Sequence, residues 1–117
     1  MGLLTTHVLD TANGIPAPRV KIELYAVTGD GAFSALNTML TNDDGRCDSA
    51  LLEGDAFSVG VYELRFHVGS YFEQQRKPDM PVFLNVVPVR FQVSDPNEHF
   101  HVPLLISPFG YTTYRGS

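Results

Sequence analysis

Apolar and polar residues alternate with a period of two along much of this chain, which is the pattern of half-buried β-strands. In residues 19–27, Val20, Ile22, Leu24 and Ala26 occupy alternate positions, and polar or amphipathic side chains take the positions between them. This pattern predicts an antiparallel strand with one face in a hydrophobic core. The same alternation recurs in residues 61–68, 89–93 and 100–106.

Turn-forming residues separate these segments at short intervals. The turn signals are Asn13-Gly14, Gly29-Asp30-Gly31, Asp43-Asp44-Gly45, Glu53-Gly54-Asp55 and Ser94-Asp95-Pro96-Asn97. Weaker strand patterns cover residues 5–10, 33–41 and 111–114. About eight short strands with little else predict an all-β fold, and specifically a β-sandwich.

One segment, residues 70–77, has a helical rather than an alternating pattern. Ser70 is a plausible N-cap, and Glu73 stands three residues later, where it completes a capping box. Pro78 ends the segment, since proline cannot continue a helix. We therefore predict one short helix within the sandwich.

Composition sets limits on the class of protein. The 117 residues are 44% hydrophobic, which suits one domain over residues 1–117 with its own core. The formal net charge of -5 argues against a nucleic-acid partner, which would require a basic surface. Cys47 is the one cysteine, so no internal disulfide forms and a reducing compartment is expected.

The beginning of the chain has no basic segment followed by an apolar run, so no secretory signal is expected. The apolar stretches are also much shorter than the roughly 20 residues that a membrane-spanning helix needs. These observations favour a soluble, cytoplasmic protein with no membrane partner.

Imidazole side chains are the first candidates for chemistry. If Phe100, Val102 and Leu104 face the core, then His99 and His101 project from the opposite face of the same strand. That outer face is half apolar, which is typical of a face covered by another subunit. Partial burial there would keep an imidazole neutral and available as a base near neutral pH. The first strand carries a third imidazole, His7, on a face shared with Thr5 and Leu9.

Other polar residues have simpler interpretations. His67, Arg65 and Arg90 alternate with core positions, so exposure to solvent is the expectation for them. Asp43 and Asp44 are expected to form a turn, which would leave Arg46 on a loop where it could meet a ligand. Cys47 is expected to be a small buried hydrophobic residue, since nothing in the sequence places a base beside it.

One alternative is inorganic. His99 and His101 on one strand face, with a third histidine, match the ligand set of an open catalytic zinc site. The spacing of two histidines around one residue is a weak signal, and no sequence feature identifies the third ligand. We therefore do not expect a native metal site.

Longer motifs go further than these patterns. The chain opens with Thr6-His7-Val8-Leu9-Asp10-Thr11, followed by Gly14-Ile15-Pro16-Ala17, and has Val61-Tyr62-Glu63-Leu64-Arg65-Phe66 and Pro88-Val89-Arg90-Phe91 in its middle. It ends with His99-Phe100-His101-Val102-Pro103-Leu104-Leu105-Ile106-Ser107-Pro108-Phe109-Gly110-Tyr111-Thr112-Thr113-Tyr114-Arg115-Gly116-Ser117. Over essentially its whole length the chain resembles the transthyretin-like family. The Tyr-Arg-Gly-Ser ending resembles the enzyme branch of that family, the 5-hydroxyisourate hydrolases, because hormone-carrying transthyretins lack it and lack the equivalents of His7 and His101.

The resemblance implies a transthyretin-like (prealbumin-like) sandwich of eight strands with one short helix. It implies dimers formed by edge pairing and a homotetramer made of two such dimers, with sites in the channel between them. It also implies the site residues. His7 and His101 would be catalytic, and the substrate-binding residues would be Arg46, Tyr114, Arg115, Gly116, Ser117 and His99.

The activity implied is hydrolysis of 5-hydroxyisourate to 2-oxo-4-hydroxy-4-carboxy-5-ureidoimidazoline in urate degradation, with no cofactor. The residue types suit this reaction, because imidazoles can activate water and guanidinium groups can hold a planar, electron-rich ring. The alternative is a non-catalytic carrier of a small ligand in the same channel. A purely structural sandwich would leave the polar residues from three separate segments unexplained.

Overall fold

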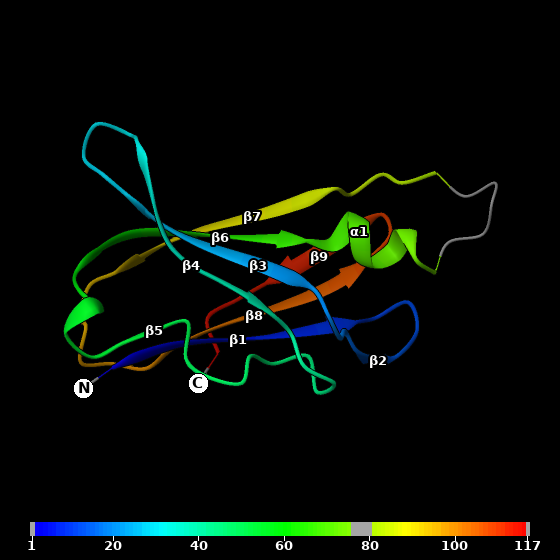
Figure 1. The fold of residues 1–117 in the computed structure, drawn as a ribbon, viewed down its shortest axis with the longest axis horizontal. Helices are drawn as coiled ribbons and strands as arrows, with labels where there is room; N and C mark the ends of the chain where they lie inside the picture. Colours follow the sequence, from blue (N-terminus) through cyan, green and yellow to red (C-terminus); the bar gives the residue numbers. More distant parts are fainter. Residues whose placement is uncertain (1, 76–80, 117) are drawn as a thin grey trace.

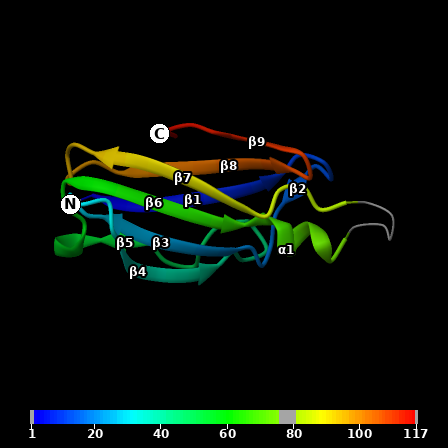
Figure 2. The ribbon, with the colours of Figure 1, turned by 90° about the horizontal axis from the view of Figure 1, so that it is seen from above.

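A computed structural model of the protein describes residues 2–75 and 81–116. Its strands form two sheets with one hydrophobic core between them, and a short helix lies at one end (Figures 1 and 2). The first sheet contains β1 (Leu3–Asp10), β2 (Ile15–Pro16), β5 (Leu52–Glu53), β8 (Phe100–Ser107) and β9 (Gly110–Thr113). The second sheet contains β3 (Lys21–Val27), β4 (Phe33–Leu40), β6 (Gly60–His67) and β7 (Val86–Val93). The predicted all-β sandwich is confirmed.

The order of strands brings the two ends of the sequence together. The first sheet runs β2-β1-β8-β9, with β5 also paired to β1, and the second runs β4-β3-β6-β7. Figure 1 shows β1 and β8 side by side, although they come from opposite ends of the chain. These two strands are parallel, whereas the other named pairs are antiparallel. The parallel register places Thr5 opposite His101 and His7 opposite Pro103.

The predicted alternation decides which side chains enter the core. On β8, Phe100, Val102, Leu104 and Ile106 are at most 5% exposed, and the histidine between the first two is only half-buried. On β6, the same side of the strand buries Tyr62, Leu64 and Phe66. Each fully buried side chain of this size stabilises the fold by about 1.5–3 kcal/mol. The core therefore fixes which face of each strand is left for other groups.

The helix differs from its prediction at both ends. Helix α1 spans Val68–Glu73, its N-cap is His67, and no side chain caps it. Ser70 lies inside the helix and is exposed, so the predicted capping box does not form. Helix α1 begins earlier because Gly69 packs against the segment before β7, where its backbone N–H donates to the carbonyl oxygen of Asn85 at 2.8 Å. The end of the predicted segment, residues 76–78, lies outside the described residues.

The only other helical segment in the described residues is a short 3-10 helix, η1 (Gly54–Ala56), between β5 and β6. Neither helix is long and apolar enough to cross a membrane, a finding that covers residues 2–75 and 81–116.

The outer face of the second sheet carries a polar network, where the predicted solvent exposure is confirmed for Arg90 but is wrong for Arg65 and His67, which are half-buried. His67 Nε2 lies 2.6 Å from Glu23 Oε1, and the His67 side chain is only 25% exposed. Glu63 is buried and accepts hydrogen bonds from Arg65 and Arg90 at 2.8 Å and 3.2 Å. Burial acts to raise the pKa of Glu63, but the hydrogen bonds and charges of the two arginines outweigh it and lower that pKa.

Candidate active site

The outer face of the first sheet gathers the predicted imidazoles. On β1, Leu4 and Val8 point into the core, and Thr5 and His7 point to the opposite face, where they are half-buried. The parallel register places the side chain of Thr5 beside that of His101 and leaves His7 one step further along the same face. The face is therefore formed by two strands that are adjacent only after the chain has folded.

His101 occupies the centre of this face. Its Nδ1 lies 2.8 Å from the hydroxyl oxygen of Thr5. Its Nε2 has no hydrogen-bond partner within the described part of the chain. Burial is the main reason that the pKa of His101 is lowered from its ordinary value of 6.5, and the charges of Arg46, His99 and His7 lower it further. The His101 imidazole is therefore neutral at neutral pH.

His99 lies just before β8 and is more exposed than His101. The centroids of the two imidazole rings are 6.3 Å apart, and the rings are inclined by 71°. His99 Nε2 also lies 2.8 Å from the Thr5 hydroxyl oxygen. Thr5 therefore joins the two imidazoles, a role that the sequence analysis did not assign to it.

His7 is held by the backbone of the loop after β4. Its Nε2 lies 2.9 Å from the carbonyl oxygen of Asp44. A carbonyl oxygen only accepts, so His7 donates from Nε2, and in the neutral ring the lone pair is on Nδ1. Burial, and then the charge of Arg46, lower the pKa of His7.

Arg46 reaches this face because its loop packs closely against β1. The predicted turn at Asp43-Asp44-Gly45 forms, and the Asn42 side-chain oxygen accepts hydrogen bonds from the backbone N–H groups of Asp44 and Arg46. Gly45 has a φ of 75°, and a Cβ there would lie 2.3 Å from the carbonyl oxygen of Val8. Only glycine fits that approach. The backbone of Arg46 consequently forms a β-bridge with His7.

A hollow of about 510 Å³ lies over this face. Arg46, His99 and His101 line it together with Thr5, and His7 is beside it through the bridge to Arg46. The remaining lining residues are Leu3, Thr6, Cys47, Asp48, Ser49, Ala50 and Glu53. The structure thus brings two predicted imidazoles and the predicted loop guanidinium to one hollow.

The C-terminal tail is divided between two places. The backbone N–H of Gly116 donates to the carbonyl oxygen of His101 at 2.8 Å, and a Cβ on Gly116 would lie 2.6 Å from His101 Cδ2. Tyr114 and Arg115 instead line a different hollow, near Phe100, where the Arg115 guanidinium lies 4.0 Å from the ring centroid. The Arg115 Nη2 also donates to the backbone carbonyl oxygen of His99 at 3.3 Å, but within one chain neither side chain lines the hollow that holds the imidazoles. Ser117 lies outside the described residues.

Cys47 is half-buried and packs against the core at the edge of the hollow. Burial raises the pKa of its thiol to about 11, and the charge of Asp48 adds to the effect. At neutral pH the thiol is therefore protonated and a poor nucleophile.

The zinc alternative finds no support in the donor positions of this chain. Among residues 2–75 and 81–116, no three His, Cys, Asp or Glu side chains are placed to hold a metal ion together. The two imidazoles that share the Thr5 hydroxyl are engaged by hydrogen bonds instead.

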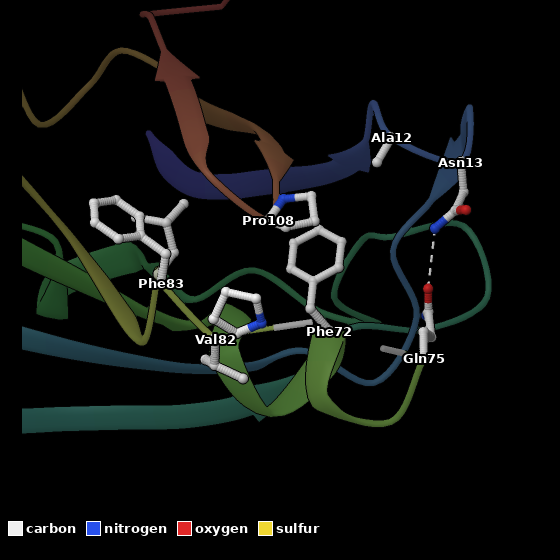
Figure 3. Close-up of a pocket in the computed structure, with 9 residues that line it drawn as sticks. Ala12, Asn13, Phe72, Gln75, Val82, Phe83 and Pro108 are labelled. Carbon is white, nitrogen blue, oxygen red and sulfur yellow. Dashed lines mark hydrogen bonds between the residues drawn. The ribbon is translucent and has the colours of Figure 1, made fainter. Parts of the chain in front are cut away.

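A third, smaller hollow lies at the helical end of the molecule and has a different character (Figure 3). Its volume is about 160 Å³, and Phe72 of α1 and Pro108 face one another across it. Its polar contact is the hydrogen bond from Asn13 Nδ2 to Gln75 Oε1, at 3.0 Å. None of the described residues that line this hollow has a titratable side chain, so they offer no group for acid–base chemistry.

Comparison with known proteins agrees with this geometry. The model of the HIUase/Transthyretin family matches residues 4–116. A protein of Rhizobium meliloti (strain 1021) named 5-hydroxyisourate hydrolase 2 is 55% identical over 118 residues, which cover 99% of this chain and 97% of that protein. The solved 5-hydroxyisourate hydrolase of Klebsiella pneumoniae is 31% identical, with a TM-score of 0.82 and full coverage of both chains.

Transthyretin has the same fold. The crystal structure of transthyretin from Sparus aurata matches with a TM-score of 0.86 at 30% identity, covering 97% of this chain and 95% of that one. The fold, the site and the sequence likeness over nearly the full length lead to one assignment. The chain belongs to the HIUase/Transthyretin family.

Proposed function

We propose that this protein hydrolyses 5-hydroxyisourate, a cyclic amide, to 2-oxo-4-hydroxy-4-carboxy-5-ureidoimidazoline in the degradation of urate. The observation that carries the proposal is the half-buried imidazole of His101, whose Nε2 has no partner among the described residues and which lines the same hollow as Arg46. A base and a cation side by side are what attack of water on a carbonyl requires. Relatives that are 43–55% identical over nearly the whole chain carry the name 5-hydroxyisourate hydrolase.

In the proposed reaction, water adds to a ring carbonyl carbon and gives one proton to His101 Nε2. Arg46 faces the negative charge that develops on the carbonyl oxygen. The carbon–nitrogen bond of the ring then breaks, and the imidazolium returns its proton to the leaving nitrogen. The carboxylic acid that forms ionises, and His101 is again a neutral base. No electron is transferred, so the proposal includes no cofactor.

His7 has a supporting role in this proposal. Its Nε2 is occupied by the carbonyl oxygen of Asp44, which leaves Nδ1, without a partner among the described residues, to orient water or substrate. Gly116 gives the tail a place against the His101 ring. We assign Tyr114, Arg115 and Ser117 to substrate binding only within an assembly of several chains, because Tyr114 and Arg115 line a different hollow in one chain.

We propose that this assembly is a homotetramer made of two dimers. Strands β7 and β9 end their sheets, so each has an unpaired edge that can accept a second copy. Tyr111 and Tyr114, on or beside β9, are 45% and 58% exposed, which leaves apolar surface for a further contact. Light scattering should give a mass about four times 12.9 kDa. A fully active monomer would contradict the shared site.

The test of the activity is direct. 5-Hydroxyisourate is generated in solution by enzymatic oxidation of urate, and its ultraviolet absorbance is followed with and without the protein. We expect decay faster than the spontaneous rate, and loss of about 10²–10⁴-fold of the acceleration in His101→Asn. Decay at the spontaneous rate with the native protein would overturn the hydrolase proposal.

The same assay separates the carrier alternative, which the likeness to transthyretin from Sparus aurata keeps open. A carrier would bind a small ligand in the hollow without consuming it. The absorbance would then decay at the spontaneous rate while a titration showed saturable binding.

A further inference from the structure

Thr5 lies between the two imidazoles of the candidate active site. It stands opposite His101 in the parallel register of β1 and β8. Its hydroxyl oxygen is 2.8 Å from His101 Nδ1 and 2.8 Å from His99 Nε2. One hydroxyl therefore makes hydrogen bonds to both rings, and the direction of each bond determines where the ring protons are.

The hydroxyl has one hydrogen to donate, and a neutral imidazole has one N–H group and one accepting nitrogen. If Thr5 donates to His101 Nδ1, the proton of neutral His101 is on Nε2. If Thr5 donates to His99 Nε2 instead, it accepts from His101 Nδ1–H, and Nε2 of His101 keeps its lone pair. The two directions give His101 opposite chemical characters.

The surroundings of the ring show which nitrogen could receive a proton from water. Nδ1 is occupied by Thr5, and the Cδ2 edge lies against Gly116, where a Cβ would be 2.6 Å away. The remaining nitrogen, Nε2, is without a partner among the described residues. A base at His101 must therefore act through Nε2, which requires the proton to be on Nδ1.

We propose that Thr5 is a positioning residue, which accepts a hydrogen bond from His101 Nδ1–H and donates one to His99 Nε2, and so holds His101 in the tautomer with a basic Nε2. The proposal rests on the proposed hydrolysis. It gives His99 the role of final acceptor in a chain of two hydrogen bonds instead of a substrate contact.

This chain of bonds also serves the protonated state. When Nε2 takes the proton from water, the Nδ1–H bond to Thr5 is already in place and becomes a charge-assisted bond, which is stronger. No group has to rotate at that step. His7 differs, because the carbonyl oxygen of Asp44 fixes its tautomer and no side chain is involved. Of His7 and His101, only His101 has a tautomer that depends on a hydroxyl that a substitution can remove.

The kinetic test compares Thr5→Val, Thr5→Ser and a control. Valine keeps the size and β-branching of threonine but makes neither hydrogen bond, whereas serine keeps the hydroxyl. Thr38→Val is the matched control, since Thr38 is exposed on β4 of the other sheet. With 5-hydroxyisourate, we expect kcat of Thr5→Val to fall by about 10–100-fold with KM changed by less than about threefold. We expect Thr5→Ser and Thr38→Val to stay within about threefold of the native kcat.

The pH profile gives a second measurement. The Thr5 bond stabilises protonated His101 more than neutral His101, so its loss should move the acid limb of kcat/KM to lower pH, by about half a unit. Thr5→Ser should keep the native limb. The other charged and titratable groups around the ring are unchanged in all three variants, namely His7, Arg46, Cys47, Asp48, Glu53 and His99.

The tautomer itself is read by NMR of protein carrying ¹⁵N-labelled histidine, at a pH where the rings are neutral. We expect His101 of the native protein and of Thr5→Ser to carry its proton on Nδ1. We expect Thr5→Val to shift toward the Nε2–H form, which free imidazole side chains prefer. This measurement needs no substrate.

The outcomes distinguish the two proposals. If the native protein does not accelerate decay of 5-hydroxyisourate, the proposed function is wrong, and the NMR result still decides the role of Thr5. If the native protein is active but its His101 carries the proton on Nε2, the Thr5 proposal is wrong. It is equally wrong if Thr5→Val keeps the native kcat, or if Thr5→Ser is as impaired as Thr5→Val. If Thr5→Val fails to fold, the native tautomer and the Thr5→Ser kinetics decide.

Discussion

Gly116→Ala should disable the candidate site while leaving the fold intact. The added methyl group would lie 2.6 Å from His101 Cδ2, where an unstrained contact between carbon atoms is about 3.5–4.0 Å. The ring or the tail must therefore move by about 1 Å. A displacement of this size at a catalytic group costs about 10²-fold in rate. We expect kcat/KM to fall about 100-fold, equivalent to about 2.7 kcal/mol of transition-state stabilisation.

The effect on stability should be small, because the contact lies at the end of the chain. At most, the substitution removes the hydrogen bond from Gly116 N–H to the carbonyl oxygen of His101, worth about 1 kcal/mol. Thermal unfolding followed by circular dichroism should shift by no more than about 4–8 °C. The ultraviolet assay with 5-hydroxyisourate measures the rate.

Gly110→Ala is the control for this substitution. Gly110 lies on β9, and a Cβ there meets Ser107 Oγ at 3.8 Å, an ordinary contact. This variant should keep the native kcat/KM. A Gly116→Ala protein with the native rate would refute the argument from close approach, and so would an equal loss of rate in Gly110→Ala.

Three further predictions concern protonation and charge. Burial and the charge of Arg46 lower the pKa of His101 from 6.5, and the proposed base is the neutral ring. On the acid side, kcat/KM should therefore fall to half its maximum at a pH below 6.5. A midpoint above 6.5 would contradict the assignment of His101 as the base. Glu63→Gln should lower the free energy of unfolding, measured in urea, by about 1–2 kcal/mol, because a neutral group replaces the buried carboxylate between Arg65 and Arg90. The same substitution should leave kcat/KM unchanged. Burial raises the pKa of the Cys47 thiol to about 11, so only about one part in a thousand is thiolate at pH 8. Cys47 should therefore react with iodoacetamide far more slowly than free glutathione does. Equal rates would refute its burial.

Local pattern was sufficient to predict much of the fold. Alternation along residues 100–106 correctly placed Phe100 and Val102 in the core and His99 and His101 outside it. This works because successive side chains on a strand point to opposite faces, so one buried position indicates which of its neighbours are buried. The loop at Asp43-Asp44-Gly45 was predictable for a similar reason, since turn residues act over a few positions.

The pairing of strands was not predictable from the same information. Threonine is common in strands, and nothing near Thr5 in the sequence indicates that it would lie between two imidazoles that are 94 and 96 residues away. Alternation gives the face of a strand but neither its partner nor its register. The polar network of His67 with Glu23 was missed for the same reason, because their contact depends on the register of β3 and β6.

The helix shows a different limit. Ser70 and Glu73 have the spacing of a capping box, but burial of Val68 and Gly69 against the segment before β7 moves the start of α1. Tertiary packing outweighs a local motif when the two disagree. The position of Arg115, away from the imidazoles, was also not predictable. Its cation–π contact with Phe100 depends on tertiary packing and has no local sequence pattern.

The parallel contact of β1 with β8 also has a consequence for the time at which the site comes into existence. During synthesis, β1 leaves the ribosome first, and its long partner follows some 96 residues later, measured from Thr5 to His101. Until then no local hairpin can supply that partner, because a parallel pair cannot be closed by a short turn. Contacts this distant make folding slow and keep it from starting at one end. A chain that stops before β8 therefore lacks the pairing of Thr5 with His101, and the candidate site exists only after both strands have been made and paired.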